Sequence, residues 1–330
     1  MRATREPVRW GILSTARINR SVVPRLQESP ESEVVAVASR DPARAAAYAR
    51  EWGIPHAHGS YEALLADPEV EAVYISLPNA DHVPWSIRAL EAGKHVLCEK
   101  PLSRRPDDVT RAFDAADRAD RILVEAFMYR HHPQTARTVE LLRAGAVGEI
   151  RLVRASFAFL LDGERNVRLR PELDGGALMD VGCYCVSGSR IAVGAEPLEA
   201  SALQIVGPTG VDVRLAGTLV FPNDVLAQID CGFDLVDRSG LEVTGTEGIL
   251  RVAYPWTTEE VGIEVRRGRT LERVEVPSPD RYRLQGDNVS RAIRGLEPSL
   301  LGREDALAQA RAIDALYRSA ELGGSPVGIG

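Results

Sequence analysis

The stretch VRWGILSTARIN, residues 8–19, decides how the first part of the chain folds. Its first six residues are mostly apolar, which is typical of a buried strand, and the residues from 17 onward follow a helical pattern. The loop between them stands where a dinucleotide-binding turn, G-x-G-x-x-G, would lie. Ser14, Ala16 and Asn19 occupy the three glycine positions. The stretch predicts a strand–turn–helix unit and leaves open whether its loop binds a nucleotide.

Strand-like and helix-like segments alternate over the first part of the chain. The expected strands are residues 8–13, 34–38, 70–76, 94–98 and 122–126. The expected helices are residues 17–28, 42–52, 60–66, 80–92 and 106–119. Alternation of apolar strands with helices predicts an α/β fold, in which a parallel sheet has helices on both faces.

The second part of the chain has a different pattern. A helix at 133–144, a strand at 149–160 and a loop through 166–169 lead to a helix at 177–193. Strands of period two follow at 199–206, 211–220, 225–234, 241–245, 248–253, 261–266 and 271–276, and helices at 283–295 and 303–320 close the chain. This order predicts an α+β domain with a large, mainly antiparallel open sheet. We place the domains at residues 1–127 and 128–330, and the last helices could pack back on the first domain.

Composition narrows the class of protein. With 330 residues, 45% of them hydrophobic and 26% charged, the chain is typical of a globular protein of two domains. The net charge of −7 argues against a nucleic-acid partner. The chain has no apolar run of membrane-spanning length, its start lacks the apolar core of a signal peptide, and its four cysteines give no disulfide framework. We therefore expect a cytoplasmic protein with no membrane contact.

Lysine is rare in this sequence. Only Lys94 and Lys100 are lysines among the 40 cationic side chains, which indicates either a coding bias toward arginine or sites that arginine cannot serve. Lysine exchanges a proton when its pKa is lowered, whereas arginine does not. Lys100 leaves the fifth expected strand at its carboxyl end, where open α/β sheets bind ligands. Lys94 opens the same strand at the opposite edge, so we expect it to be a solvated turn residue.

The end of the second expected strand favours NADP over NAD. An NAD enzyme usually places an acidic residue there for the ribose hydroxyls, whereas this chain has Ser39 and Arg40. A hydroxyl and a guanidinium suit a 2′-phosphate, and Arg44 could assist from the next helix. Asp41 precedes Pro42 and is expected to cap that helix instead. The alternative is that both arginines are solvated surface residues.

A second cluster of chemical groups is expected at 175–190. On a helix, Asp180 and Tyr184 are spaced i, i+4 and share one face. An ammonium beside a phenol lowers the pKa of the phenol, so these residues and Lys100 could form a proton-transfer cluster. The alternative is that Asp180 caps locally and Tyr184 is a core aromatic. Adjacent histidines such as His131 and His132 point in different directions, and we expect no metal ion.

Five segments together resemble a known family of sugar dehydrogenases. They are the loop at 11–19, LPNADH (77–82), AGKHVLCEKP (92–101), EAFMYRHHPQ (125–134) and GGALMDVGCY (175–184). The chain is similar to the glucose–fructose oxidoreductase, inositol dehydrogenase and rhizopine catabolism family, and further to its branch of NADP-dependent xylose and glucose 1-dehydrogenases and dimeric dihydrodiol dehydrogenases. The resemblance implies an N-terminal Rossmann domain and a C-terminal open sheet that pairs subunits as a homodimer or homotetramer.

The resemblance also implies roles for individual residues. Lys100 would match the catalytic lysine, Asp180 the substrate-binding acid and Tyr184 the acid/base. Arg168 is expected to enter the cleft and to bind cofactor or substrate. The cofactor-binding residues expected in all are Leu13, Ser14, Thr15, Ala16, Arg17, Ile18, Ser39, Arg40, Arg44, Leu77, Pro78, Asn79, His82, Glu99, Lys100 and Arg168.

Three hypotheses about function follow. The first is an NADP-dependent oxidoreductase that transfers a hydride between nicotinamide and a sugar or polyol carbon, most simply an aldose 1-dehydrogenase. The second is an NADPH-dependent reductase of a nucleotide-linked ketosugar, which would use the same residues. The third is a non-catalytic NADP-binding regulator, against which the set of Lys100, Asp180 and Tyr184 argues. The loop near 160–170 would contribute to the choice of substrate.

Overall fold

The computed structural model describes residues 6–163, 166–257 and 260–330, and its backbone contacts divide the chain into two compact units. The first unit extends to Ser103 and also contains Asp107–Met128 and Asp280–Ala306. The second contains Arg104–Pro106, Tyr129–Pro279 and Leu307–Gly330. Within the loop near 160–170, residues 164 and 165 lie outside the described residues.

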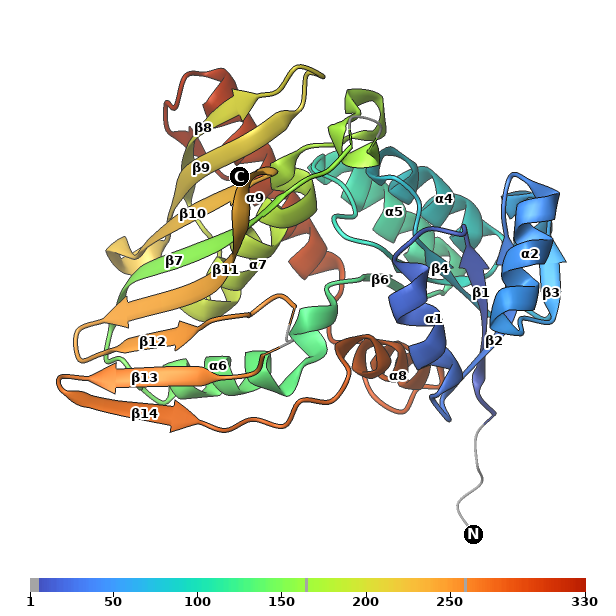
Figure 1. The fold of residues 1–330 in the computed structure, drawn as a ribbon, viewed down its shortest axis with the longest axis horizontal. Helices are drawn as coiled ribbons and strands as arrows, with labels where there is room; N and C mark the ends of the chain where they lie inside the picture. Colours follow the sequence, from blue (N-terminus) through green and yellow to red (C-terminus); the bar gives the residue numbers. More distant parts are fainter. Residues whose placement is uncertain (1–5, 164–165, 258–259) are drawn as a thin grey trace, which may run out of the picture. The chain divides into compact units, whose positions relative to one another are not determined.

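The first unit is built on a six-stranded sheet with the order β3-β2-β1-β4-β5-β6, and every strand pair in it is parallel (Figure 1). Its strands are β1 (Val8–Leu13), β2 (Ser32–Ala38), β3 (His56–His58), β4 (Ala72–Ile75), β5 (His95–Cys98) and β6 (Leu123–Glu125). Its helices are α1 (Asn19–Gln27), α2 (Pro42–Trp52), α3 (Tyr61–Leu65), α4 (Asn79–Glu91), α5 (Pro106–Ala119) and α8 (Arg281–Ile293). The predicted α/β class is confirmed, in the strand order of a dinucleotide-binding fold.

Helix α8 belongs to the first unit, although the predicted boundaries gave the whole of 128–330 to the second domain. It packs against α1. The indole of Trp10, fully buried in β1, donates to Ser290 Oγ at 3.1 Å, and Arg25 donates to Asp280 at 2.9 Å. Apolar burial and these polar contacts together fix α8 to this unit.

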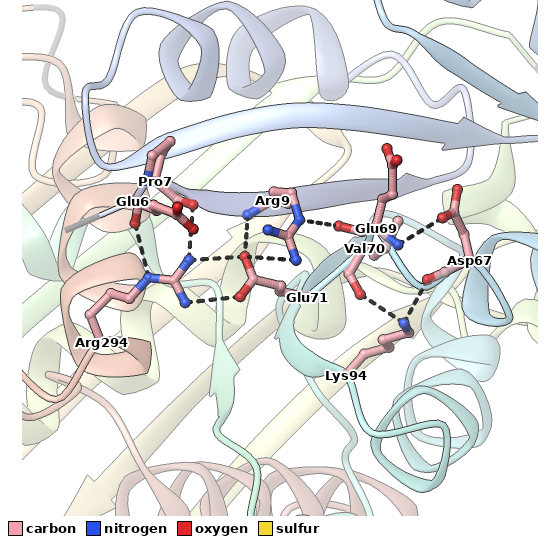
Figure 2. A network of polar contacts seen from close by, with 9 residues as sticks. All are labelled: Glu6, Pro7, Arg9, Asp67, Glu69, Val70, Glu71, Lys94 and Arg294. Atoms are coloured by element: carbon pink, nitrogen blue, oxygen red, sulfur yellow. Dashed lines mark hydrogen bonds and ion pairs between the residues drawn. The ribbon is translucent and has the colours of Figure 1, made fainter.

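A polar network at the amino-terminal ends of β1, β4 and β5 holds together segments of the first unit that are distant in sequence (Figure 2). The Glu71 carboxylate accepts hydrogen bonds from the Arg9 backbone N–H and from two nitrogens of the Arg294 guanidinium, at 2.9–3.1 Å. Lys94 donates to the backbone oxygens of Asp67 and Val70, both at 2.7 Å. Lys94 is only 8% exposed, so the expectation of a solvated turn residue is wrong. A compact ammonium with several donors can satisfy two converging carbonyls, which explains a lysine here.

The second unit contains a nine-stranded sheet with the order β14-β13-β12-β11-β7-β10-β9-β8-β15. Its strands are β7 (Ile150–Leu160), β8 (Glu199–Val206), β9 (Asp212–Val220), β10 (Leu226–Gly232), β11 (Asp234–Gly245), β12 (Ile249–Val252), β13 (Ile263–Arg267), β14 (Thr270–Val274) and β15 (Val327–Gly328). All pairs are antiparallel except β7 with β10. The predicted, mainly antiparallel sheet is confirmed.

One face of this sheet carries helices and the other is open (Figure 1). The helices are α6 (Pro133–Arg143), α7 (Cys183–Val193) and α9 (Arg303–Glu321), the last of which begins in the first unit. The Trp256 ring packs at Gly188 of α7, where a Cβ atom would lie 2.3 Å from it. The open face has a hollow of about 1360 Å³ and exposes apolar side chains such as Leu203, at 64%.

Two further observations concern the chain as a whole. Among the described residues, no helix combines the length and the apolar character that a membrane span requires. All four cysteines are buried thiols without a disulfide.

Candidate active site

The turn after β1 reproduces a glycine-type geometry without glycine. Ser14 has a φ of +133°, in the left-handed region that normally favours glycine. Its hydroxyl contacts Ser76 Oγ at 2.8 Å and accepts the Ala16 N–H at 3.1 Å. The fully buried Asn19 donates from its side chain to Ser14 O at 2.9 Å. Side-chain hydrogen bonds thus hold the turn, a role that sequence reasoning missed for Asn19.

This turn leads to a helix N-terminus that suits an anion. Helix α1 begins at Asn19, and in the described structure no side chain caps its first turn. Uncapped N–H groups at a helix start favour negative charge, as in phosphate-binding loops. Leu13 is buried at the end of β1, whereas Thr15 and Ile18 are half-buried and Arg17 is exposed. The predicted phosphate loop therefore has an accessible edge and a rigid base.

The end of β2 gathers the groups expected to hold a 2′-phosphate. The Asp41 carboxylate accepts the N–H groups of Ala43 and Arg44 at 2.9 and 3.2 Å, so its predicted capping role is confirmed. Ser39 is buried, and its hydroxyl accepts the Asp41 N–H at 3.2 Å. The Arg44 guanidinium donates to Thr15 O at 3.3 Å, which links this end of β2 to the β1–α1 turn.

A tyrosine joins the two arginines there. Burial raises the pKa of the Tyr61 hydroxyl, while the positive charges of Arg40 and Arg44 oppose that rise. Both guanidinium groups therefore lie in the neighbourhood of the Tyr61 hydroxyl. Tyr61 comes from α3 and packs edge-on against Trp85, with ring centroids 5.0 Å apart. Sequence reasoning did not identify Tyr61.

His82 connects the loops that follow β4 and β5. Its Nδ1 lies 2.8 Å from Pro101 O and its Nε2 lies 2.8 Å from Leu77 O. The ring is 1% exposed, and burial lowers the pKa of this histidine. The sequence analysis expected His82 among the cofactor-binding residues, and its hydrogen-bond contacts here are with the backbone. It fixes the spacing of two loops, and the half-buried Pro78 and Asn79 follow the first of them.

Glu99 and Lys100 emerge from the end of β5. Tyr74 is completely buried and donates its hydroxyl to Glu99 Oε1 at 2.6 Å. Tyr282 of α8 lies near both groups. Burial raises the pKa of the Tyr282 hydroxyl, the Glu99 carboxylate adds to that rise, and the Lys100 ammonium opposes it. Lys100 is half-buried, and its bond to Pro101 is cis. The first unit thus holds Glu99 rigidly beside Lys100.

In the second unit, Asp180 pairs with Arg168. Arg168 Nε donates to Asp180 Oδ2 at 2.6 Å, and the carboxylate side chain is 16% exposed. The backbone supports this pair, because the Gly176 N–H donates to Arg168 O at 2.9 Å and the Asp180 N–H donates to Gly176 O at 3.0 Å. A Cβ atom at Gly175 would lie 2.4 Å from Arg168 O, so only glycine fits there. Arg168, predicted as a cofactor or substrate ligand, is therefore placed to orient Asp180.

The segment that carries Asp180 and Tyr184 departs from a regular helix. Leu178–Gly182 form a π-helical turn that continues into α7. Such turns widen the backbone and occur often at functional sites. Tyr184 is 5% exposed, and its ring packs 5.7 Å from Tyr129 and 5.5 Å from Phe157, measured between centroids. The alternative interpretation of the sequence, that Tyr184 is a core aromatic, agrees with these aromatic neighbours. They also fix the ring of Tyr184 in place.

Asp212 anchors the start of this segment and was not predicted. Its carboxylate accepts the Leu178 N–H at 2.7 Å and the Tyr317 hydroxyl at 2.8 Å. Gly176, at a φ of +132°, passes so close that a Cβ atom would lie 2.1 Å from Asp212 Oδ1. Burial raises the pKa of Asp212 to about 6, although the hydrogen bonds from Leu178 and Tyr317 lower it. A buried carboxyl thus holds the backbone just before Asp180.

Comparison with known proteins identifies similar chains over almost the full length. D-xylose 1-dehydrogenase (NADP(+)) 2 of Haloferax volcanii is 40% identical over 320 residues, which are 95% of this chain and 98% of that protein. The structure of a 3-ketoreductase, KijD10, from Actinomadura kijaniata with NADP and TDP-benzene is 31% identical, with a TM-score of 0.90, and the match covers 95% of this chain and 98% of that one. The aldose-aldose oxidoreductase of Caulobacter crescentus is 28% identical, with a TM-score of 0.91, and the match covers 98% of this chain and 100% of that one.

Family models match both parts of the sequence. Residues 8–127 match an oxidoreductase family with an NAD-binding Rossmann fold, and residues 135–251 match the GFO/IDH/MocA C-terminal domain. The parallel strand order of the first unit and the separate, wide sheet of the second unit agree with these matches. The chain therefore belongs to the GFO/IDH/MocA family of oxidoreductases.

Proposed function

We propose that this protein is an NADP-dependent oxidoreductase that oxidises an aldose at C1. The observation that carries the substrate class is the 40% identity to a D-xylose 1-dehydrogenase (NADP(+)) over 95% of the chain. A 33% identical relative is named as a dTDP-3,4-didehydro-2,6-dideoxy-α-D-glucose 3-reductase, which keeps a nucleotide-linked ketosugar as the second candidate substrate.

The first unit fits NADP at both phosphate positions. The strained Ser14 turn and the uncapped start of α1 suit the pyrophosphate. Ser39, Arg40 and Arg44 suit the 2′-phosphate, because the carboxylate of Asp41, which follows Arg40 in sequence, is used as a helix cap. A carboxylate directed at a ribose would disfavour the extra phosphate, and the structure directs this one into α2. This arrangement supports NADP as the cofactor.

In the proposed mechanism, the protein handles the proton and the alignment of the sugar. Bound NADP supplies the hydride chemistry. Tyr184, as its phenolate, would accept the proton of the C1 hydroxyl and become the phenol, and Lys100 would hydrogen-bond the same oxygen and stabilise its developing negative charge. Asp180 accepts a hydrogen bond from a neighbouring hydroxyl, and Arg168 holds its carboxylate in place. The residue assignments come from the family resemblance and remain proposals.

Two further predictions belong with this function. The open face of the nine-stranded sheet is proposed to pair two copies of the chain, because its broad hollow exposes apolar side chains such as Leu203 among charged ones such as Arg154 and Glu242. A cytoplasmic location stays a prediction from the sequence.

The test is a turnover assay with purified protein, NADP or NAD, and separate panels of aldoses, polyols and dTDP-ketosugars. Formation of reduced nicotinamide with NADP and xylose or glucose is the expected result. Turnover confined to a dTDP-ketosugar with NADPH would replace the first candidate with the second. Tight NADP binding without turnover on any panel would contradict both and favour a regulator.

A further inference from the structure

Three side chains with metal-binding atoms converge at the edge strand of the first unit, away from the residues assigned to catalysis. His56 and His58 are two residues apart on β3, so their rings lie on one face of the strand. Asp67 Oδ2 lies 3.0 Å from His56 Nδ1 and 2.9 Å from His58 Nε2. All three ligand atoms lie within 4.8 Å of one another. Two imidazoles and a carboxylate therefore face a common point.

The carboxylate of this group is held rigidly (Figure 2). Asp67 Oδ1 accepts the Glu69 N–H at 2.9 Å, which leaves Oδ2 to the histidines. The Asp67 backbone oxygen accepts from Lys94 Nζ at 2.7 Å, so the buried ammonium braces the loop through its carbonyls. The side chain of Asp67 is 7% exposed, whereas those of His56 and His58 are 39% and 22% exposed. The base of the group is fixed, and a solute can reach its outer side.

Glu69 offers an outer partner to one of these imidazoles. Its carboxylate lies 3.6 Å from His56 Nε2, the ring nitrogen other than the one that contacts Asp67. A carboxylate on the far nitrogen of a ligating histidine is the usual way in which proteins orient such a ligand.

We propose that His56, His58 and Asp67 bind a divalent transition-metal ion of the zinc class, with water completing its coordination. Two imidazole nitrogens and one carboxylate oxygen are donors that this class prefers. With metal–ligand bonds of about 2.0–2.1 Å, ligand atoms in a tetrahedral site lie roughly 3.3 Å apart. The two contacts of Asp67 with the histidines, at 2.9 and 3.0 Å, need to open by only a few tenths of an ångström, and the two imidazole nitrogens, within 4.8 Å of each other, need to settle at the same spacing. The inference is independent of the proposed function and departs from the expectation, drawn from the sequence, that the chain binds no metal ion.

The test uses full-length protein dialysed against a chelator and then titrated with Zn²⁺ by calorimetry and with Co²⁺ by visible absorption. We expect one ion per chain, a Co²⁺ spectrum with nitrogen and oxygen ligands, and a higher thermal midpoint with Zn²⁺. His56→Ala and His58→Ala should abolish all three signals. Glu69→Gln should weaken binding by about 10- to 100-fold, the usual effect of losing a partner of a ligating histidine.

Glu62→Gln is the matched control, because this exposed carboxylate lies on the adjacent α3 and should leave binding unchanged. Thermal unfolding of each variant without metal separates loss of the site from loss of the fold. If His56→Ala is folded and still binds the ion, the proposal is overturned. It is equally overturned if the wild-type protein takes up no Zn²⁺ or Co²⁺ at stoichiometric concentrations.

Discussion

Lysine occurs at two positions of this chain, and the structure gives the two ammonium groups different surroundings. Lys94 is buried and bonds two backbone carbonyls, whereas Lys100 is half-buried at the end of β5 beside Glu99. A lysine at each of these two positions therefore has its own physical reason. The reason at Lys94 is structural, and the one that we propose for Lys100 is chemical. These reasons can be separated by experiment.

Lys100→Met should lower kcat by about 10²- to 10⁴-fold, the range for loss of a group that assists proton transfer, and should leave NADP binding intact. Lys94→Met should leave kcat and NADP binding unchanged and should lower the free energy of unfolding. It leaves the oxygens of Asp67 and Val70 without that donor, at a cost of about 1–3 kcal/mol in stability. Turnover, NADP affinity and urea denaturation of both variants decide the matter. Unchanged turnover in Lys100→Met would remove Lys100 from the mechanism.

The arginines after β2 allow a prediction about cofactor choice. Arg40→Ala should raise the KM for NADP by about 10- to 100-fold, since a hydrogen bond to a charged group contributes roughly 1.5–3 kcal/mol. The KM for NAD should hardly change, because NAD has no 2′-phosphate. Arg20→Ala is the control, as this exposed arginine of α1 pairs with Glu51. Equal loss with NADP and NAD would contradict a specific phosphate contact.

At the scale of elements, the start of the π-helical segment depends on a carboxyl group whose pKa is raised. Burial raises the pKa of Asp212 from 3.8 to about 6. An acid with a higher pKa in the folded state binds more protons when folded, so its contribution to stability is fully present below pH 3.8 and is lost as pH rises through about 6. Asp212→Asn removes this titration. From pH 4 to 7, the variant should therefore gain about 2–3 kcal/mol relative to wild type.

Urea denaturation of the wild type and Asp212→Asn across that pH range measures the effect. Asp314→Asn serves as the reference, because its carboxylate is partly exposed on α9. A stability difference between wild type and Asp212→Asn that stays constant with pH would mean that Asp212 does not titrate in this range.

The elements that sequence could predict are those whose signal is local. The apolar runs of β1, β2 and β5, and the Asp41-Pro42 helix start, gave nearly the observed bounds because strand burial and capping depend on neighbouring residues. The π-helical turn at Leu178–Gly182 could not be predicted, since it depends on packing of Gly182 against Cys231 of β10. The two-residue strand β15 depends on pairing with β8, a contact distant in sequence.

The site followed the same rule. Ser39, Arg40 and Lys100 were proposed from the sequence because they follow strand ends, where a parallel sheet places its ligands. Tyr61, Asp212 and the structural role of His82 were missed, because each acts through a contact with a residue distant in sequence. The paired histidines of β3 did carry a signal, the spacing of two on a strand, but Asp67 completes the group only in three dimensions.

At the scale of the whole molecule, the sequence allowed the last helices to pack on the first domain but did not indicate that α8 would be the one to do so. The helix follows the nine-stranded sheet in sequence, yet its contacts are with α1 and β2 of the first unit. The hydrogen bond from Trp10 to Ser290 joins residues 280 positions apart. Periodicity predicts that a helix has an apolar face, but it does not say which sheet will bury it.

The open sheet face gives the last prediction. Leu203 and Ile205 project from β8 on that face and are 64% and 51% exposed. A stable dimer buries about 800 Å² on each partner, and a broad sheet face that carries apolar side chains among ion pairs such as Arg154–Glu242 is suited to supply that area. Wild-type protein should sediment as a dimer or tetramer, and Leu203→Glu with Ile205→Glu should sediment as a monomer, because the charges would be buried unpaired in the interface. A monomeric wild type, or a double variant that sediments unchanged, would show that this face does not pair the subunits.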